Sequence, residues 1–129
     1  MPTIQHIAHY CLDLEALRTY YCNYFGAASN GKYVNAKKRF ASYFLSFEDG
    51  SALEIMSKNG IEQASEIIAE SLGFIHLAFS VSLEEKVIKL TERIRKDGYN
   101  GEGECRWTGD DLYERVILDP ERNRIEIMI

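Results

Sequence analysis

The feature that most constrains the fold of this chain is an internal repeat. Residues 4–57 and 74–129 follow one template, in which a strand with a histidine leads to an amphipathic helix and then to a hairpin. The last strands of the two copies, residues 53–56 and 125–128, differ at one position. Two copies of one strand-helix-strands module are therefore the simplest interpretation.

The helix of each copy is indicated by apolar residues that recur every three or four positions. In the first copy they span Leu14–Phe25, and Gly26 follows as a stop signal. In the second copy they span residues 83–94, and Ser82 and Glu85 are predicted to form a capping box at the start of the helix. The strands that follow alternate apolar and polar residues around turns at positions 49–50 and 119–120.

These elements predict an α+β fold of two tandem βαβββ modules. We expect the modules to form one curved mixed sheet with the helices on its outer face. At 129 residues the chain is expected to be a single domain, with module one at about 1–57, a linker at 58–73 and module two at about 74–129. The linker is expected to hold a short helix at 64–71, and the stretch 99–111 a loop or an irregular strand.

Composition excludes several classes of function. The chain has 15 Lys and Arg against 20 Asp and Glu, a net charge of -5, which argues against nucleic-acid binding. The short basic run 37–39 is interpreted as solvated surface. There is no apolar run of the roughly 18 residues that a membrane span needs, and no signal-peptide pattern. The three cysteines are widely spaced and read as reduced thiols, so a cytoplasmic location is expected.

Four polar residues lie on the sheet face that the helices do not cover. Alternate residues of a strand face opposite sides, so the apolar odd positions of 74–81 leave His76 on the other face. The isoleucines of the last strand likewise leave Glu126 on the opposite face. The same alternation places His6 and Glu54 in the first copy. His6 precedes Glu54 by 48 residues and His76 precedes Glu126 by 50, so the two pairs match.

Two imidazoles and two carboxylates on one concave face make a suitable site for a divalent metal ion. Their charges nearly cancel those of a 2+ ion, and the lack of thiolates argues against a structural zinc site. Four ligands leave one or two positions open, as a catalytic metal requires. A single strand Glu or surface His is more often merely solvated, but matched positions in both copies favour the metal site. The predicted ligands are His6, Glu54, His76 and Glu126.

These residues make the sequence resemble the vicinal oxygen chelate superfamily, the glyoxalase/bleomycin resistance/dioxygenase family, and within it glyoxalase I. The resemblance covers almost the whole chain and rests on the stretches around His6, residues 52–56, residues 73–79 and residues 119–126. Many relatives lack one or more ligands, whereas here the full His-Glu-His-Glu set is present. The family commonly has a Gly where Arg122 stands, and only Arg39 and Asn59 are loose candidates for contacts with glutathione.

The resemblance implies a lyase that isomerises the thiol hemithioacetal of a 2-oxoaldehyde to a 2-hydroxyacyl thioester, by proton transfer through a metal-bound enediolate. It implies Glu126 as the base and Glu54 as its partner for the other face of the substrate. Octahedral N and O ligands suit Ni, Co, Zn or Mn. Small members are homodimers, so a homodimer is expected, with swapped or unswapped pairing of modules. The partner would be a small molecule, with no nucleic acid or membrane involved.

Two other classes of function stay open. One is another metalloenzyme of the superfamily, an epimerase, a thiol transferase or a dioxygenase, although Glu54 argues against the first and last of these. The other is a small-molecule or antibiotic binding protein, in which two clustered carboxylates without a cation are hard to explain. Around the site, Tyr10 and Ser80 could line a pocket. Residues 106 and 107 (Arg and Trp) could close over a substrate or anchor a loop, and His9 is expected to pack against a helix.

Overall fold

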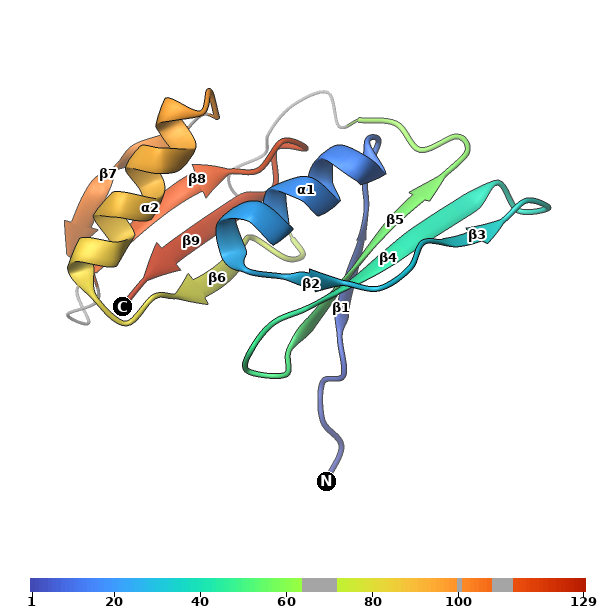
Figure 1. Ribbon diagram of the computed structural model, residues 1–129, viewed down its shortest axis with the longest axis horizontal. Helices are drawn as coiled ribbons and strands as arrows, with labels where there is room; N and C mark the ends of the chain where they lie inside the picture. The colour runs from blue at the N-terminus through green and yellow to red at the C-terminus, as the bar shows by residue number, and fades with distance from the viewer. Residues whose placement is uncertain (64–71, 100, 108–112) are drawn as a thin grey trace. The chain divides into compact units, whose positions relative to one another are not determined.

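The computed structural model describes residues 1–63, 72–99 and 113–129, and the backbone of residues 101–107. The chain divides into two compact units, Met1–Ser65 and Glu66–Ile129. The elements of the first unit are β1 (Ile7–Tyr10), α1 (Leu14–Phe25), β2 (Ala28–Ser29), β3 (Tyr33–Asn35), β4 (Phe40–Ser46) and β5 (Ala52–Lys58). Those of the second are β6 (Leu77–Ser80), α2 (Glu84–Lys96), β7 (Gly101–Trp107), β8 (Tyr113–Leu118) and β9 (Arg124–Met128) (Figure 1).

Each unit has one mixed sheet. In the first, the order is β1-β5-β4-β2, with β3 also paired to β4, and in the second it is β6-β9-β8-β7. The outer strands β1 and β6 run parallel to β5 and β9, and the remaining pairs are antiparallel. The prediction of an α+β fold with two βαβββ modules is confirmed, with one mixed sheet in each unit where a single sheet was expected. In module one the second strand is divided into β2 and β3.

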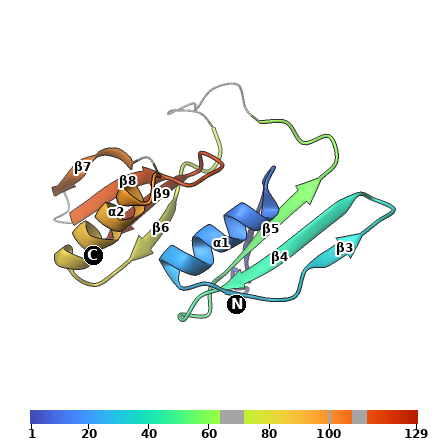
Figure 2. The ribbon, with the colours of Figure 1, turned by 45° about the horizontal axis from the view of Figure 1, so that its top comes forward.

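The helix of each unit covers one face of its own sheet (Figure 2). In the first unit, Leu17 and Tyr21 of α1 are fully buried, as are Leu45 of β4 and Ile55 of β5. In the second unit, the buried core is built from α2, β8 and β9, and its fully buried side chains are Val87, Ile94, Ile117, Ile125 and Ile127. Burial of apolar side chains between helix and sheet therefore fixes which strand face stays open.

The start of α1 follows the sequence signals, and the start of α2 does not. Asp13 caps α1, accepting a 2.9 Å hydrogen bond from the Ala16 amide, and Gly26 ends it at φ 66°. The capping box predicted at Ser82 and Glu85 is wrong, because the N-cap of α2 is Leu83 and no side-chain hydrogen bond caps this helix. The amide of Val81 is still hydrogen-bonded to Met128 of the sheet, so the chain turns at Ser82, where φ is 68°. A capping residue has an extended backbone, so Ser82 does not cap the helix.

Two further expectations, on residues 101–107 and on the histidine strands, have clear outcomes. Residues 101–107 form a strand whose register against β8 shifts between Glu102 and Arg106, so the alternative of an irregular strand is confirmed. The strands that follow the histidines are shorter than expected. β1 begins at Ile7 and β6 at Leu77, where pairing with the parallel strands β5 and β9 begins. The short helix expected at 64–71 lies outside the described residues. No helix in the described part of the chain is long and apolar enough to cross a membrane.

Candidate metal centre

The first pair of candidate ligands lies on the sheet face opposite α1. The Nε2 atom of His6 is 3.2 Å from Oε2 of Glu54, and the two side chains are 33% and 16% exposed. Glu54 lies in β5 between Ala8 of β1 and Phe44 of β4, its partners in the two ladders. Its sequence neighbours Leu53 and Ile55 are buried on the helix side, so strand alternation directs Glu54 to the open face.

The second pair repeats this arrangement in the other unit. The Nε2 atom of His76 is 3.3 Å from Oε2 of Glu126, with the side chains 35% and 14% exposed. Glu126 of β9 pairs with Ala78 of β6 and Val116 of β8. The structure thus brings each predicted histidine to its predicted glutamate in the same kind of register.

The spacing within each pair fits two neighbouring ligands of one metal ion. Ligands that lie about 2.1 Å from a metal ion and at right angles to each other are about 3.0 Å apart. The N–O distances of 3.2 and 3.3 Å are close to that value, and imidazole nitrogen with carboxylate oxygen suits a divalent transition metal. Within residues 1–63, 72–99 and 113–129, no group of three or more His, Cys, Asp or Glu could hold a metal ion. Among these described residues, each His–Glu pair is therefore a group of two candidate ligands.

Comparison with known proteins identifies the family. A model of the Glyoxalase/Bleomycin resistance protein/Dioxygenase superfamily matches residues 3–127, nearly the whole chain. The chain belongs to this superfamily. No curated protein sequence matches it.

Solved structures of this superfamily and its relatives share the fold. A glyoxylase/bleomycin resistance protein/dioxygenase domain from Frankia sp. EAN1pec matches with a TM-score of 0.82 at 16% identity, covering 99% of this chain and 91% of that one. A glyoxalase I mutant from Zea mays matches with a TM-score of 0.77 at 22% identity, covering 96% of this chain and 43% of that one.

A third similar structure contains a metal ion. It is a mutant of the fosfomycin resistance protein FosX from Listeria monocytogenes, complexed with Mn(II) and 1S,2S-dihydroxypropylphosphonic acid. It matches with a TM-score of 0.74 at 20% identity, covering 98% of this chain and 91% of that one. At these identities the likeness establishes the fold.

The structure also gives the positions of most of the other residues that the sequence pointed to. Tyr10 and Ser80 occupy equivalent positions on the ligand faces, each paired in register with the methionine that follows the candidate glutamate by two residues. Asn59 donates a 3.1 Å backbone hydrogen bond to the carbonyl of Arg39, so the two loose glutathione candidates are neighbours. The side chains of residues 106 and 107 lie outside the described part. His9 pairs with Ile55 in the ladder and is half-buried.

Sequence reasoning missed two side chains that contact His6. The ring of Phe44 packs edge-on against its imidazole, with centroids 5.0 Å apart and planes at 77°. The Nδ1 atom of His6 lies in hydrogen-bond contact with Oε1 of Gln5. Alternation along residues 42–46 could have placed Phe44 on the ligand face, but only the register of β4 against β5 puts it opposite Glu54.

A polar cluster on the helix side of the first unit ties α1 to β4. The hydroxyl of Tyr43 donates to both carboxylate oxygens of Glu15, at 2.9 and 3.1 Å, and Lys32 Nζ lies 3.0 Å from Oε1 of the same residue. The bonds from Lys32 and then Tyr43 lower the pKa of Glu15, whereas burial and then the bond to Glu15 raise the pKa of Tyr43. The guanidinium of Arg18 lies 5.0 Å from the centroid of the Tyr43 ring.

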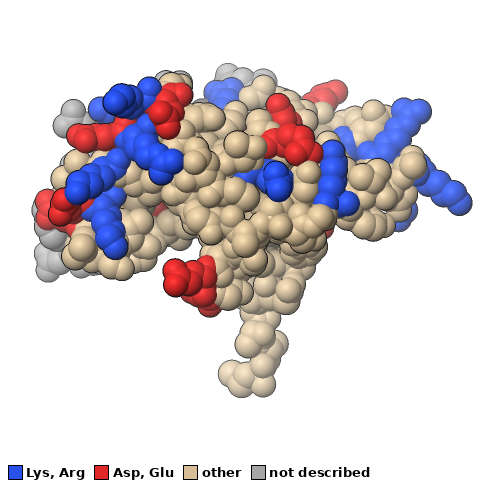
Figure 3. All heavy atoms as spheres, viewed as in Figure 1, with Lys and Arg blue, Asp and Glu red and all other residues tan. Residues whose placement is uncertain are grey.

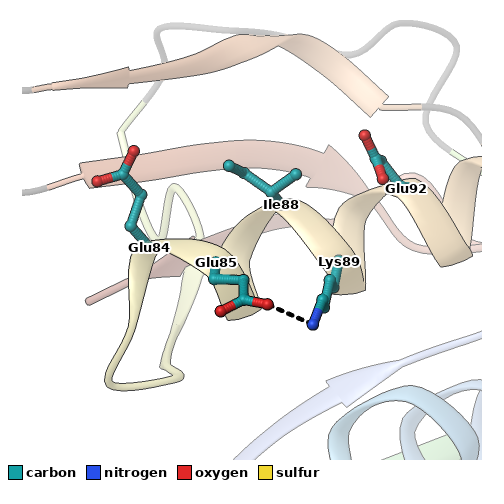
Figure 4. A pocket seen from close by; sticks show the side chains of 5 residues that line it. All are labelled: Glu84, Glu85, Ile88, Lys89 and Glu92. Carbon is teal, nitrogen blue, oxygen red and sulfur yellow. Dashed lines mark ion pairs between the residues drawn. The ribbon is translucent and has the colours of Figure 1, made fainter.

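Two further groups of charged side chains lie on exposed surface. The basic run 37–39 is exposed, as expected, near the end of the first unit where positive side chains gather in Figure 3. On the exposed side of α2, a shallow hollow of about 500 Å³ is lined by Glu84, Glu85, Ile88, Lys89 and Glu92 (Figure 4). Lys89 pairs with Glu85 one turn away, an ordinary interaction of a solvated helix.

Proposed function

We propose that this protein is a metal-dependent lyase of the glyoxalase I type. Its substrate would be the hemithioacetal formed by a 2-oxoaldehyde and a small thiol, and its product the thioester of a 2-hydroxy acid. The observation that carries the proposal is the repeated His–Glu pair, in the same register and on the same kind of sheet face in both units.

The metal ligands we propose are His6 and Glu54 of the first unit together with His76 and Glu126 of the second. Two neutral imidazoles and two carboxylates suit Ni, Co, Zn or Mn, and FosX, which shares the fold, was solved with Mn(II). When bound, the metal supplies Lewis-acid stabilisation of the negative charge that develops on the two vicinal oxygens of the substrate.

Glu126 is proposed as the base. Its carboxylate removes the proton from the carbon that carries the thiol and returns it to the neighbouring carbon, which had been the carbonyl carbon. Its side chain is 14% exposed, so this carboxylate is largely shielded from water. Glu54, at 16% exposure, is the matching carboxylate for the opposite face of the substrate.

We further infer a homodimer that acts in the cytoplasm. The strands β1 and β6 each end the sheet of their unit, and apolar residues just before them, Ile4 and Phe74, are 85% and 96% exposed. A second copy of the chain that covers these edges would remove this surface from water. The two halves of a metal site would come from one chain or from both chains of such a dimer.

Turnover tests the proposal. Methylglyoxal is premixed with glutathione, and thioester absorbance is followed with wild-type protein, chelated protein and protein reloaded with Ni, Co, Zn or Mn. We expect chelation to abolish turnover, reloading to restore it, and Glu126→Gln to lower kcat by about 10²-fold or more, the usual contribution of a general base. Glu121→Gln, a glutamate in the turn before the same strand, is the matched control and should retain activity.

The alternatives give different results. If all four ligands bind metal but no thiol hemithioacetal is turned over, the protein would instead be assigned another reaction of the superfamily, such as epimerisation, thiol transfer or ring cleavage. Tight binding of a small molecule that survives chelation would indicate a binding protein.

A further inference from the structure

The two His–Glu pairs are alike in their own geometry but differ in what surrounds the histidine. His6 is contacted on three sides: Nε2 faces Glu54 at 3.2 Å, Nδ1 contacts the side-chain carbonyl oxygen of Gln5, and the ring packs edge-on against Phe44. An imidazole held in this way has little freedom to rotate about its side-chain torsions.

At the two equivalent positions of the second unit, the residues present cannot make these contacts. The residue before His76 is Ile75, which has no side-chain atom that accepts a hydrogen bond. The residue of β8 that pairs with Glu126 is Val116, which has no aromatic ring, whereas Phe44 pairs with Glu54 in the first unit. The asymmetry therefore follows from the sequence at two equivalent pairs of positions.

The Gln5 contact has a specific consequence for metal binding. A neutral imidazole carries one proton, and donation from Nδ1 to the amide oxygen leaves the lone pair on Nε2, the atom that faces Glu54. Metal-binding histidines commonly donate their second nitrogen to such an acceptor, which fixes tautomer and ring orientation. The edge-on ring of Phe44 restricts the same imidazole from the sheet side.

We propose that Gln5 and Phe44 are positioning residues that hold His6 ready to bind metal, so that the first His–Glu pair is the anchoring half of the metal site. This inference rests on the proposed metal site, but not on the identity of the substrate.

Measurement of metal affinity tests the proposed role of Gln5 and Phe44 independently of enzymatic activity. The Kd for Co(II) is measured by competition with a chromophoric chelator for wild type, Gln5→Leu, Gln5→Glu and Phe44→Leu. We expect Gln5→Leu to weaken binding about 10-fold or more, as loss of a ligand's supporting hydrogen bond does, and Gln5→Glu to restore wild-type affinity because its carboxylate accepts the same bond. Phe44→Leu should weaken binding about two- to tenfold.

Equivalent substitutions in the second unit are the controls. Ile75→Leu and Val116→Leu occupy the matching positions and should leave the Kd unchanged, and thermal unfolding of the apo proteins verifies that all variants fold. In the zinc-loaded wild type, the Nδ1 proton of His6 should give an observable imidazole NMR signal that Gln5→Leu loses.

Each outcome of these measurements supports or contradicts the positioning role of Gln5 and Phe44. Wild-type affinity in Gln5→Leu, or an equal loss in Ile75→Leu, would contradict the anchoring role. A wild-type protein that binds no Co(II) would overturn both this inference and the proposed function. Weakened binding in Gln5→Leu, in a protein that binds metal but does not turn over hemithioacetal, would support the anchoring role and reject only the lyase activity.

Discussion

Single residues of the candidate site owe their environment to their immediate neighbours in the strand. Glu54 is 16% exposed at its side chain because Leu53 and Ile55, buried beneath α1, hold the strand with this carboxylate on the other face. Ile125 and Ile127 do the same for Glu126. A shift of one residue in the register of β5 or β9 would bury the carboxylate under a helix and expose its apolar neighbours. The apolar neighbours are therefore as necessary to the site as the ligands.

Arg122, in the turn between β8 and β9, gives a test of local backbone strain. Its φ of 69° lies in the left-handed region, where a residue with a Cβ costs about 1 kcal/mol relative to Gly. The turn itself is fixed by Asp119, whose carboxylate accepts hydrogen bonds from the amides of Glu121 and Asn123 at 2.9 Å. We expect Arg122→Gly to raise the free energy of unfolding by about 0.5–1 kcal/mol in urea denaturation.

The control for that substitution is its neighbour. Glu121 has no positive φ, so Glu121→Gly should destabilise the protein by increasing the freedom of the unfolded chain. Stabilisation by both substitutions, or by neither, would contradict the claim that backbone strain at Arg122 lowers the free energy of unfolding.

At the scale of elements, α1 is attached to its sheet by polar as well as apolar contacts. Apolar burial of Leu17 and Tyr21 selects which face of the sheet α1 covers, and the bond between Glu15 and Tyr43 joins its first turn to β4. Because β4 and β5 pair along their full lengths, this attachment also supports the strand that carries Glu54.

The bond between Glu15 and Tyr43 predicts a pH dependence of stability. The pKa of Glu15 is lowered below its ordinary 4.5 in the folded protein, first by Lys32 and then by Tyr43. A depressed carboxyl pKa contributes stability above the unfolded pKa, and this contribution is lost as pH falls through the folded pKa. We expect Tyr43→Phe to lower the melting temperature at pH 7, with a difference from wild type that narrows below pH 4.5. A difference that stays constant from pH 7 to pH 3 would exclude this bond as the cause.

Local signals in the sequence predicted where helices and strands lie better than they predicted the residues at which these elements begin. Hydrophobic spacing located α1 and α2, but the capping box at Ser82 was wrong because the turn there depends on the hydrogen bond from Val81 to Met128 in β9. The strand starts at Ile7 and Leu77 likewise depend on where distant partner strands begin. Contacts between residues far apart in sequence set these boundaries, and no local pattern contains them.

At the scale of the whole molecule, the repeat made the fold and both His–Glu pairs predictable from one sequence. Equal residues at equal places in two copies imply equal positions in two sheets, and the distances of 3.2 and 3.3 Å agree with that expectation. The contacts around the two histidines that distinguish the copies depend on the three-dimensional structure as well as on the sequence. Phe44 contacts His6 through strand pairing, and Gln5 contacts it through a side-chain rotamer.

The central claim is that both pairs bind one metal ion, and metal stoichiometry with single ligand variants tests it most directly. The four variants are His6→Ala, Glu54→Gln, His76→Ala and Glu126→Gln. The account predicts one Co(II) per wild-type chain and a loss of affinity of at least 10-fold in every variant, because each removes a ligand of the same site. Two ions per chain, or variants of one unit that bind as tightly as wild type, would contradict it.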